Sequence, residues 1–126
     1  MKQTLSDRQC DFTNALALTI CKAVSLGFKV KVQEWNRLLE TQKEYVAKGV
    51  SWTMDSRHLD LLAADLILFK DGFPVANKES YRPLGVYWES LGGRWGGRFG
   101  LENESKEVQD SKMGKDPYHF EFRRPS

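Results

Sequence analysis

The sequence has little net charge and no apolar run long enough to cross a bilayer. Its 19 basic and 17 acidic side chains leave a formal net charge of +2 over 126 residues, with no basic patch or motif typical of a nucleic-acid reader. Near the N-terminus, Lys22 ends the apolar run 15–21, whereas a membrane-spanning helix needs about 20 residues. Asp7 and Asp11 argue against a secretory signal peptide. We therefore expect no nucleic-acid partner, no membrane insertion and synthesis without a signal peptide.

Cysteine is scarce as well. Cys10 and Cys21 are eleven residues apart in a segment with helical periodicity, which places their Cα atoms ~16 Å apart at a rise of ~1.5 Å per residue. A disulfide requires a Cα separation below ~7 Å. The two thiols are therefore expected to be reduced, which fits a protein made in a cytoplasm.

The composition is that of a globular protein, and we expect a single domain over residues 1–126. Hydrophobic residues make up 40% and charged residues 29% of the chain, and a chain of this size buries roughly two-thirds of its unfolded surface. The periodicity predicts an α+β fold, with a small, mainly antiparallel sheet flanked by helices. The first expected helix spans 6–26, with a Ser6–Gln9 capping box and a stop at Gly27; further helices are expected over 38–49 and from Pro83 to a stop at Gly92. Strands are expected over 28–33, 66–69 and 118–123, and the strand over 66–69 is followed by a hairpin turn at Asp71-Gly72. The segment 50–57 is expected to be a loop, and 101–115 a mobile loop.

The last of these strands separates a core face from a polar face. Tyr118, Phe120 and Phe122 alternate with His119 and Glu121, and successive side chains of a strand point to opposite sides. We assign the three aromatic residues to the core. His119 and Glu121 are then expected to point toward a cleft.

The two histidines of the chain both stand in spacings typical of metal sites. His58 precedes Asp65 by seven residues, and Asp116 precedes His119 by three. A catalytic zinc ion usually takes three ligands from histidine and carboxylate and leaves a fourth position for water. His58, Asp65 and His119 supply such a set, and Asp116 supplies a second carboxylate that can act on the water. Taken singly, each histidine is more often an ordinary polar residue, and Asp116 before Pro117 is a common turn residue.

The pattern Ser-x-His-x-x-x-x-Ala-x-Asp over 56–65, followed by Asp-x-x-His over 116–119, resembles the zinc DD-carboxypeptidase and L-alanyl-D-glutamate endopeptidase family of VanY-like peptidoglycan peptidases. Three further blocks are similar: Arg37 five residues before Gln42, the segment 87–97, and His119-Phe-Glu-Phe. The resemblance runs from about residue 28 to residue 122. Two positions depart from the family pattern, since Leu38 replaces a threonine and Leu61 replaces a usual glycine.

The resemblance implies a Hedgehog/DD-peptidase-like fold, His58, Asp65 and His119 as Zn²⁺ ligands, and Asp116 as general base. It also implies a peptidoglycan hydrolase that acts on stem peptides of the bacterial cell wall. Many relatives are phage endolysins, so we expect an L-alanyl-D-glutamate endopeptidase of that type, made in the host bacterial cytoplasm and acting as a monomer. The alternatives are a D-alanyl-D-alanine carboxypeptidase or dipeptidase, and a non-catalytic zinc-binding cell-wall or virion module.

Other polar residues are candidates for contacts with substrate. Arg37 can hold a developing oxyanion or a substrate carboxylate, and Arg57 is the alternative. Ser56 can orient the metal loop or bond within the site, and Gln42 can contact substrate. Each of these residues also fits an ordinary surface role. The same holds for Glu89, a carboxylate that competes with Asp116 as the base.

Aromatic residues near the glycine pairs 92–93 and 96–97 have two interpretations. Trp88, Trp95 and Phe99 can line a peptide or sugar cleft. Alternatively, the tryptophans belong to the core.

Overall fold

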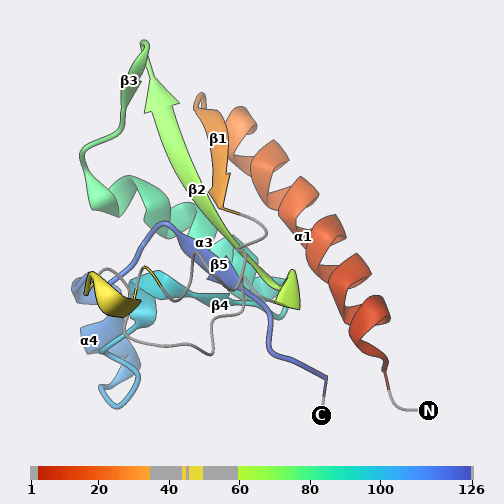
Figure 1. The fold of residues 1–126 in the computed structure, drawn as a ribbon. Coiled ribbons are helices and arrows are strands. Elements are labelled where there is room, and N and C mark those ends of the chain that lie inside the picture. Colours follow the sequence, from red (N-terminus) through yellow and green to blue (C-terminus); the bar gives the residue numbers. More distant parts are fainter. Residues whose placement is uncertain (1–2, 35–43, 45, 50–59, 126) are drawn as a thin grey trace.

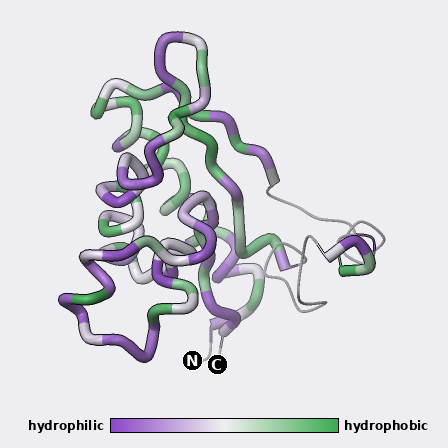
Figure 2. The backbone as a smooth tube through the Cα atoms, turned by 90° about the vertical axis from the view of Figure 1, so that its left-hand side faces the viewer, coloured by the Kyte–Doolittle hydropathy of each residue, from purple (hydrophilic) through white to green (hydrophobic). Residues whose placement is uncertain are grey.

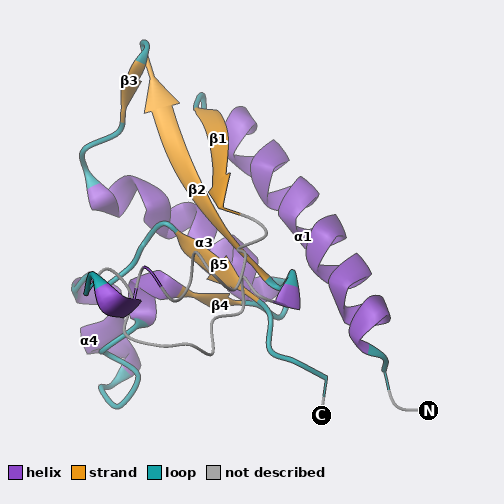
Figure 3. Ribbon diagram, viewed as in Figure 1, coloured by secondary structure: helices purple, strands orange, loops and turns teal. Residues whose placement is uncertain are grey.

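The computed structural model describes residues 3–34, 44, 46–49 and 60–125, and Figure 1 shows their arrangement. A long N-terminal helix packs beside a small sheet, and a shorter helix passes behind the strands in this view. The elements are α1 (Leu5–Ser25), β1 (Lys29–Glu34), β2 (Ala63–Lys70), β3 (Phe73–Pro74), η2 (Lys78–Tyr81), α3 (Arg82–Ser90), β4 (Arg94–Trp95), η3 (Gly96–Arg98), α4 (Lys106–Ser111) and β5 (His119–Glu121). The predicted α+β class is confirmed, and Figure 3 separates the helices from the strands.

Helix α1 begins at Leu5, one residue earlier than the sequence predicted. Its capping box joins Thr4 and Asp7 rather than Ser6 and Gln9: the Thr4 side chain accepts from the Asp7 backbone N–H, and the Asp7 carboxylate accepts from that of Thr4. The bond to Thr4 lowers the pKa of Asp7. The chain leaves the helix at Gly27, whose φ of 92° suits a residue without a Cβ. The predicted stop is therefore correct, whereas the predicted cap was wrong.

The sheet has the strand order β1-β2-β5-β4, with β3 paired to the far end of β2, and every pairing is antiparallel. Strands β2 and β3 are joined by the predicted Asp-Gly turn, where Asp71 and Gly72 have φ of 54° and 86°. Positive φ at both residues matches the right-handed twist of the strands. The long strand β2 thereby pairs with β1 and β3 at one end and with β5 at the other.

The core lies between helices α1 and α3 and one face of the sheet. The Phe12 ring of α1 meets the Trp88 ring of α3 edge-on at 5.5 Å between centroids, and Trp88 meets Phe120 of β5 at 5.8 Å. Such edge-to-face pairs add to the stabilisation from apolar burial. Trp88 and Trp95 are buried, which confirms their core interpretation. As predicted, Phe120 and Phe122 belong to the core, and Tyr118 packs against it.

The segment 101–115 is not the irregular loop that the sequence suggested, because it contains helix α4. Ser105 caps the helix by accepting from the Val108 backbone N–H. Two arginines tie the segment to the rest of the fold: Arg98 contacts Asp110 at 2.7 Å, and Arg82 donates to the Lys112 carbonyl at 2.7 Å. The hydrogen bonds to Glu89 and Asp110 raise the pKa of Arg98, and the hydrogen bond to Arg98 lowers the pKa of Asp110. Figure 2 colours the backbone by hydropathy and shows hydrophilic and hydrophobic residues intermixed along the chain.

Several other expectations concern the helices and the thiols. Cys10 and Cys21 are free and exposed, as predicted. No described helix combines the length and apolar character that crossing a bilayer requires. Of the helix expected over 38–49, residues 44 and 46–47 are helical; the rest of it, and the expected loop 50–57, lie outside the described residues.

Leu61 is held in a conformation that favours glycine. Its φ is 56°, and its side chain is 37% exposed. A left-handed backbone costs an L-residue roughly 1–2 kcal/mol, while glycine costs about 0.5–1 kcal/mol in unfolded-chain entropy. We expect Leu61→Gly to raise the free energy of unfolding by about 0.5–1 kcal/mol, measured by urea denaturation.

The matched control for this substitution is Asp71→Gly in the hairpin, where φ is 54°. Aspartate tolerates the left-handed region better than leucine does, so the gain there should be smaller. A destabilised Leu61→Gly protein would show that contacts of the leucine side chain outweigh its backbone strain.

Candidate metal centre

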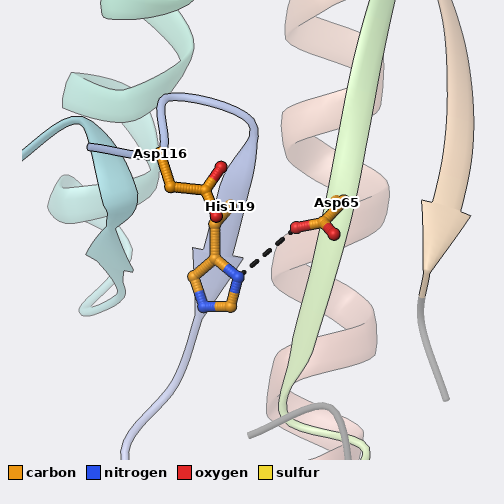
Figure 4. Close-up of side chains that lie close together, drawn as sticks. All are labelled: Asp65, Asp116 and His119. Carbon is orange, nitrogen blue, oxygen red and sulfur yellow. Dashed lines mark ion pairs between the residues drawn. The ribbon is translucent and has the colours of Figure 1, made fainter. Parts of the chain in front are cut away.

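Strands β2 and β5 place Asp65 and His119 directly opposite each other. Their neighbours Ala64 and Phe120 form the adjacent pair and are buried in the core. Because side chains alternate along a strand, Asp65 and His119 project from the other face of the sheet. Figure 4 shows the two side chains pointing toward each other in front of the strands. A rigid antiparallel pair thus joins two residues that are 54 positions apart in the sequence.

Asp116 reaches the same place from the turn that precedes β5. The His119 backbone N–H donates to the Asp116 carbonyl at 3.2 Å, and the Asp116 N–H donates to the Gly96 carbonyl at 3.0 Å. Gly96 must be a glycine here, because a Cβ at that position would lie 2.0 Å from the Asp116 carbonyl oxygen. The indole Nε1–H of Trp95 donates to the Pro117 carbonyl at 2.7 Å. The buried side chain of Trp95 thus holds this turn in place.

The side chains of Asp65, Asp116 and His119 each offer one ligand atom, and these atoms lie within 4.8 Å of one another. One imidazole nitrogen and two carboxylate oxygens form a donor set that suits Zn²⁺. His119 and Asp65 were predicted as ligands and Asp116 as a base, and the structure brings all three together. The third predicted ligand, His58, lies outside the described residues.

Both nitrogens of the His119 ring face carboxylates. Nδ1 lies 3.4 Å from Asp65 Oδ1, and Nε2 lies 2.8 Å from Glu121 Oε1. The Phe99 ring packs against the imidazole at 5.5 Å between centroids. Burial of His119, which is 8% exposed, would lower its pKa. The hydrogen bonds to Asp65 and Glu121 outweigh burial and raise the pKa to about 9. In the metal-free protein, His119 is therefore a cation between two anions, and a metal ion must displace a proton to bind it.

This raised pKa predicts how the stability of the metal-free protein depends on pH. The folded-state pKa of about 9 lies above the ordinary 6.5, so the protonated ring stabilises the fold fully below pH 6.5. The contribution is lost as the pH rises through 9. We expect the free energy of unfolding of chelator-treated protein to fall by about 1–3 kcal/mol between pH 6.5 and 9.5. His119→Gln should abolish this loss; an equal loss in that variant would assign it to other groups.

Of the remaining predicted residues, only Glu89 belongs to the described part of the chain. Arg37, Gln42, Ser56 and Arg57 lie outside the described residues. Glu89 forms an ion pair with Arg98, with Oε2 3.1 Å from Nε, whereas the described cluster consists of Asp65, Asp116 and His119.

Glu121 is the residue whose contact the sequence did not reveal. We expected it on the cleft side of the strand, and it lies on that face, but only 6% exposed and bonded to His119. The available signal was its position two residues after His119 on the same strand face.

Comparison with known proteins extends these observations. No family model matches the chain, and no curated protein matches it. Among solved structures, the L-Ala D-Glu endopeptidase ChiX of Serratia marcescens superposes with a TM-score of 0.62 at 23% identity, covering 98% of this chain and 89% of its own. A mutant of the vancomycin resistance D,D-pentapeptidase VanY from the VanB-type cassette, in complex with Zn(II), superposes with a TM-score of 0.55 at 21% identity, covering 88% and 70%.

A third solved structure, the L,D-carboxypeptidase DacB from Streptococcus pneumonia, gives a TM-score of 0.58 at 21% identity and covers 90% of this chain and 65% of its own. At these identities the likeness establishes a shared fold. The predicted resemblance is thus confirmed at the level of the fold, and the chain has the α+β architecture of these peptidases.

Proposed function

We propose that this protein is a zinc-dependent peptidase that hydrolyses peptide bonds in the stem of peptidoglycan. The observation that carries the proposal is the meeting of Asp65, Asp116 and His119 within 4.8 Å. The fold supports it, because it is shared with an L-Ala D-Glu endopeptidase, a Zn(II)-bound D,D-pentapeptidase and an L,D-carboxypeptidase. The same three residues on an unrelated fold would support a peptidase function less strongly.

The residues that would hold zinc are His58, Asp65 and His119. Two of them are described, and they provide the nitrogen and oxygen donors typical of a catalytic zinc site. When bound, zinc polarises the scissile carbonyl group and lowers the pKa of water toward 7. The rigid pairing of β2 with β5 keeps Asp65 and His119 at a fixed separation before any ligand arrives.

Asp116 is assigned the proton transfers. Its carboxylate lies beside the two ligands but on a separate turn, so it can face the attacking water rather than complete the ligand set. It would accept a proton from this water and return it to the leaving amine as the peptide bond breaks. Asp116 thereby acts first as a base and then as an acid.

Substrate contacts are assigned to residues outside the described part of the chain. Arg37 is the first candidate for the oxyanion that forms at the scissile carbonyl, and Arg57 is the second. Ser56 and Gln42 are assigned to substrate binding. The partner is then a peptidoglycan stem peptide, the protein acts as a monomer on the cell wall, and residues 1–126 form one catalytic domain.

The favoured specificity is L-alanyl-D-glutamate endopeptidase activity, in a phage-type endolysin. The second candidate is a D-alanyl-D-alanine carboxypeptidase or dipeptidase, because D,D- and L,D-peptidases share the fold. A non-catalytic zinc-binding wall module is disfavoured by the presence of Asp116 at the cluster.

Mass spectrometry of purified peptidoglycan after incubation with the protein distinguishes these activities. Stem peptides released by cleavage between L-Ala and D-Glu would support the endopeptidase. Loss of terminal D-Ala alone would assign a carboxypeptidase. Intact peptidoglycan in the presence of added zinc would contradict the proposed function.

A further inference from the structure

Glu121 lies in a row of side chains that crosses three strands. It pairs with Ala63 of β2 on one side and with Arg94 of β4 on the other. It also follows His119 by two residues, which places both on the same face of β5. Ala63 has only a methyl group opposite Glu121, and the Glu121 carboxylate is directed along its own strand to His119.

The two oxygens of this buried carboxylate have different partners. Oε1 lies 2.8 Å from His119 Nε2, and Oε2 lies 3.1 Å from Arg94 Nη1. Arg94 therefore fixes the orientation of Glu121, and its guanidinium group also lies 5.2 Å from the centre of the Phe99 ring. Since Phe99 packs on His119, the imidazole is held at its edge and on its face by one connected group.

We propose that Glu121 is a positioning residue of the metal centre: held by Arg94, it binds the Nε2–H of His119 and so leaves Nδ1 directed at Asp65 to ligate the ion. This inference rests on the proposed function, because it takes His119 as a zinc ligand. It adds a residue that touches neither metal nor substrate and acts through the histidine.

The chemistry of metal-bound histidine explains why such a residue matters. A neutral imidazole has one nitrogen that carries a proton and one that is available to a metal. A carboxylate bound to one nitrogen selects the tautomer, fixes the plane of the ring and makes the other nitrogen more basic. Without Glu121, the ring of His119 loses this selection of its tautomer and one of the contacts that fix its plane.

The test compares Glu121→Ala and Glu121→Gln with a matched control, Glu102→Ala. Glu102 contacts the same arginine, with Oε2 3.4 Å from Arg94 Nη2, but it is on the surface. Zinc affinity is measured by competition with a chromogenic chelator. We expect zinc binding to weaken about 10–100-fold in Glu121→Ala, to weaken less in Glu121→Gln, whose amide oxygen still accepts a hydrogen bond, and to stay within about threefold of wild type in Glu102→Ala.

Nitrogen-15 NMR of the His119 ring supplies a readout that a purely structural role would not change. In the zinc-loaded wild type, the proton should reside on Nε2 and the metal on Nδ1, and Glu121→Ala should lose the downfield Nε2–H signal. A proton on Nδ1 in the wild type would overturn the inference. So would Glu121→Ala with wild-type zinc affinity, or a loss of equal size in Glu102→Ala.

Failure of this inference can be distinguished from failure of the proposed function. If His119→Ala loses zinc and Glu121→Ala does not, only the positioning role is wrong. If His119→Ala binds zinc as the wild type does, the assignment of the metal centre is wrong, and the proposed role of Glu121 is wrong as well. Thermal unfolding of each variant shows that the folded proteins are being compared.

Discussion

His119→Ala is expected to abolish stoichiometric zinc binding and to lower peptidase activity by about a thousandfold or more. The ring supplies the nitrogen donor of the described cluster, and metal chemistry contributes several kcal/mol to lowering the barrier. The substitution lies outside the hydrophobic core cluster, because His119 projects from the face opposite Phe120. The zinc content of the purified protein, measured by atomic emission, is the primary readout.

The fold of this variant must be shown to persist. Loss of the cationic ring removes the contacts that it makes with Asp65 and Glu121, so some loss of stability is expected. His119→Gln is the milder companion variant, since it fills more of the space and can bond to one carboxylate. A folded His119→Ala protein that retains one equivalent of zinc would refute the ligand assignment.

Asp116→Asn is expected to retain zinc and lose turnover by about 100- to 10,000-fold, which is the usual contribution of a general base. The amide keeps the shape of the side chain but cannot accept a proton at neutral pH. The backbone bonds of this residue to Gly96 and His119 do not involve its carboxylate, so the turn should be preserved. Initial rates on peptidoglycan and zinc content are measured in parallel.

Glu89→Gln is the matched control for this substitution. Glu89 is a carboxylate bound to Arg98 at 3.1 Å, and its replacement should leave turnover close to wild type. If Asp116→Asn loses zinc together with activity, Asp116 is a ligand rather than the base. Turnover near the wild-type rate would remove Asp116 from the mechanism.

The parts of the fold that the sequence predicted well are those with strong local signals. The alternation over 118–123 assigned His119 and Phe120 to opposite faces, and the structure agrees because one face of the sheet meets the α1–α3 core. The Asp71-Gly72 turn was predictable because its backbone requires positive φ at both residues. Asp65 and His119 were predicted to meet from a spacing pattern, and strand pairing provides the physical reason.

The features that escaped prediction depend on weak or distant interactions. Helix α4 is six residues long and has no buried residue, so it carries no apolar period. The choice of Thr4 over Ser6 as the cap of α1 depends on competing local hydrogen bonds. The bond from Glu121 to His119, with Arg94 behind it, required the register of three strands.

Leu61 departs from the family pattern, and only the structure shows what this means for the backbone. The sequence placed leucine where the family pattern usually has glycine, and this raised the question of backbone geometry. The structure keeps the left-handed conformation, with φ of 56°, at the approach to β2. The leucine therefore bears a local strain while Asp65 and His119 still meet.

Reconstitution of the metal-free protein with zinc tests the central claim most directly. Protein stripped by a chelator is assayed on purified peptidoglycan before and after the addition of zinc in increments. We predict that stem-peptide cleavage is absent from the stripped protein and returns in proportion to zinc up to one equivalent. Cleavage that persists without metal, or its absence at full zinc occupancy, would contradict the account.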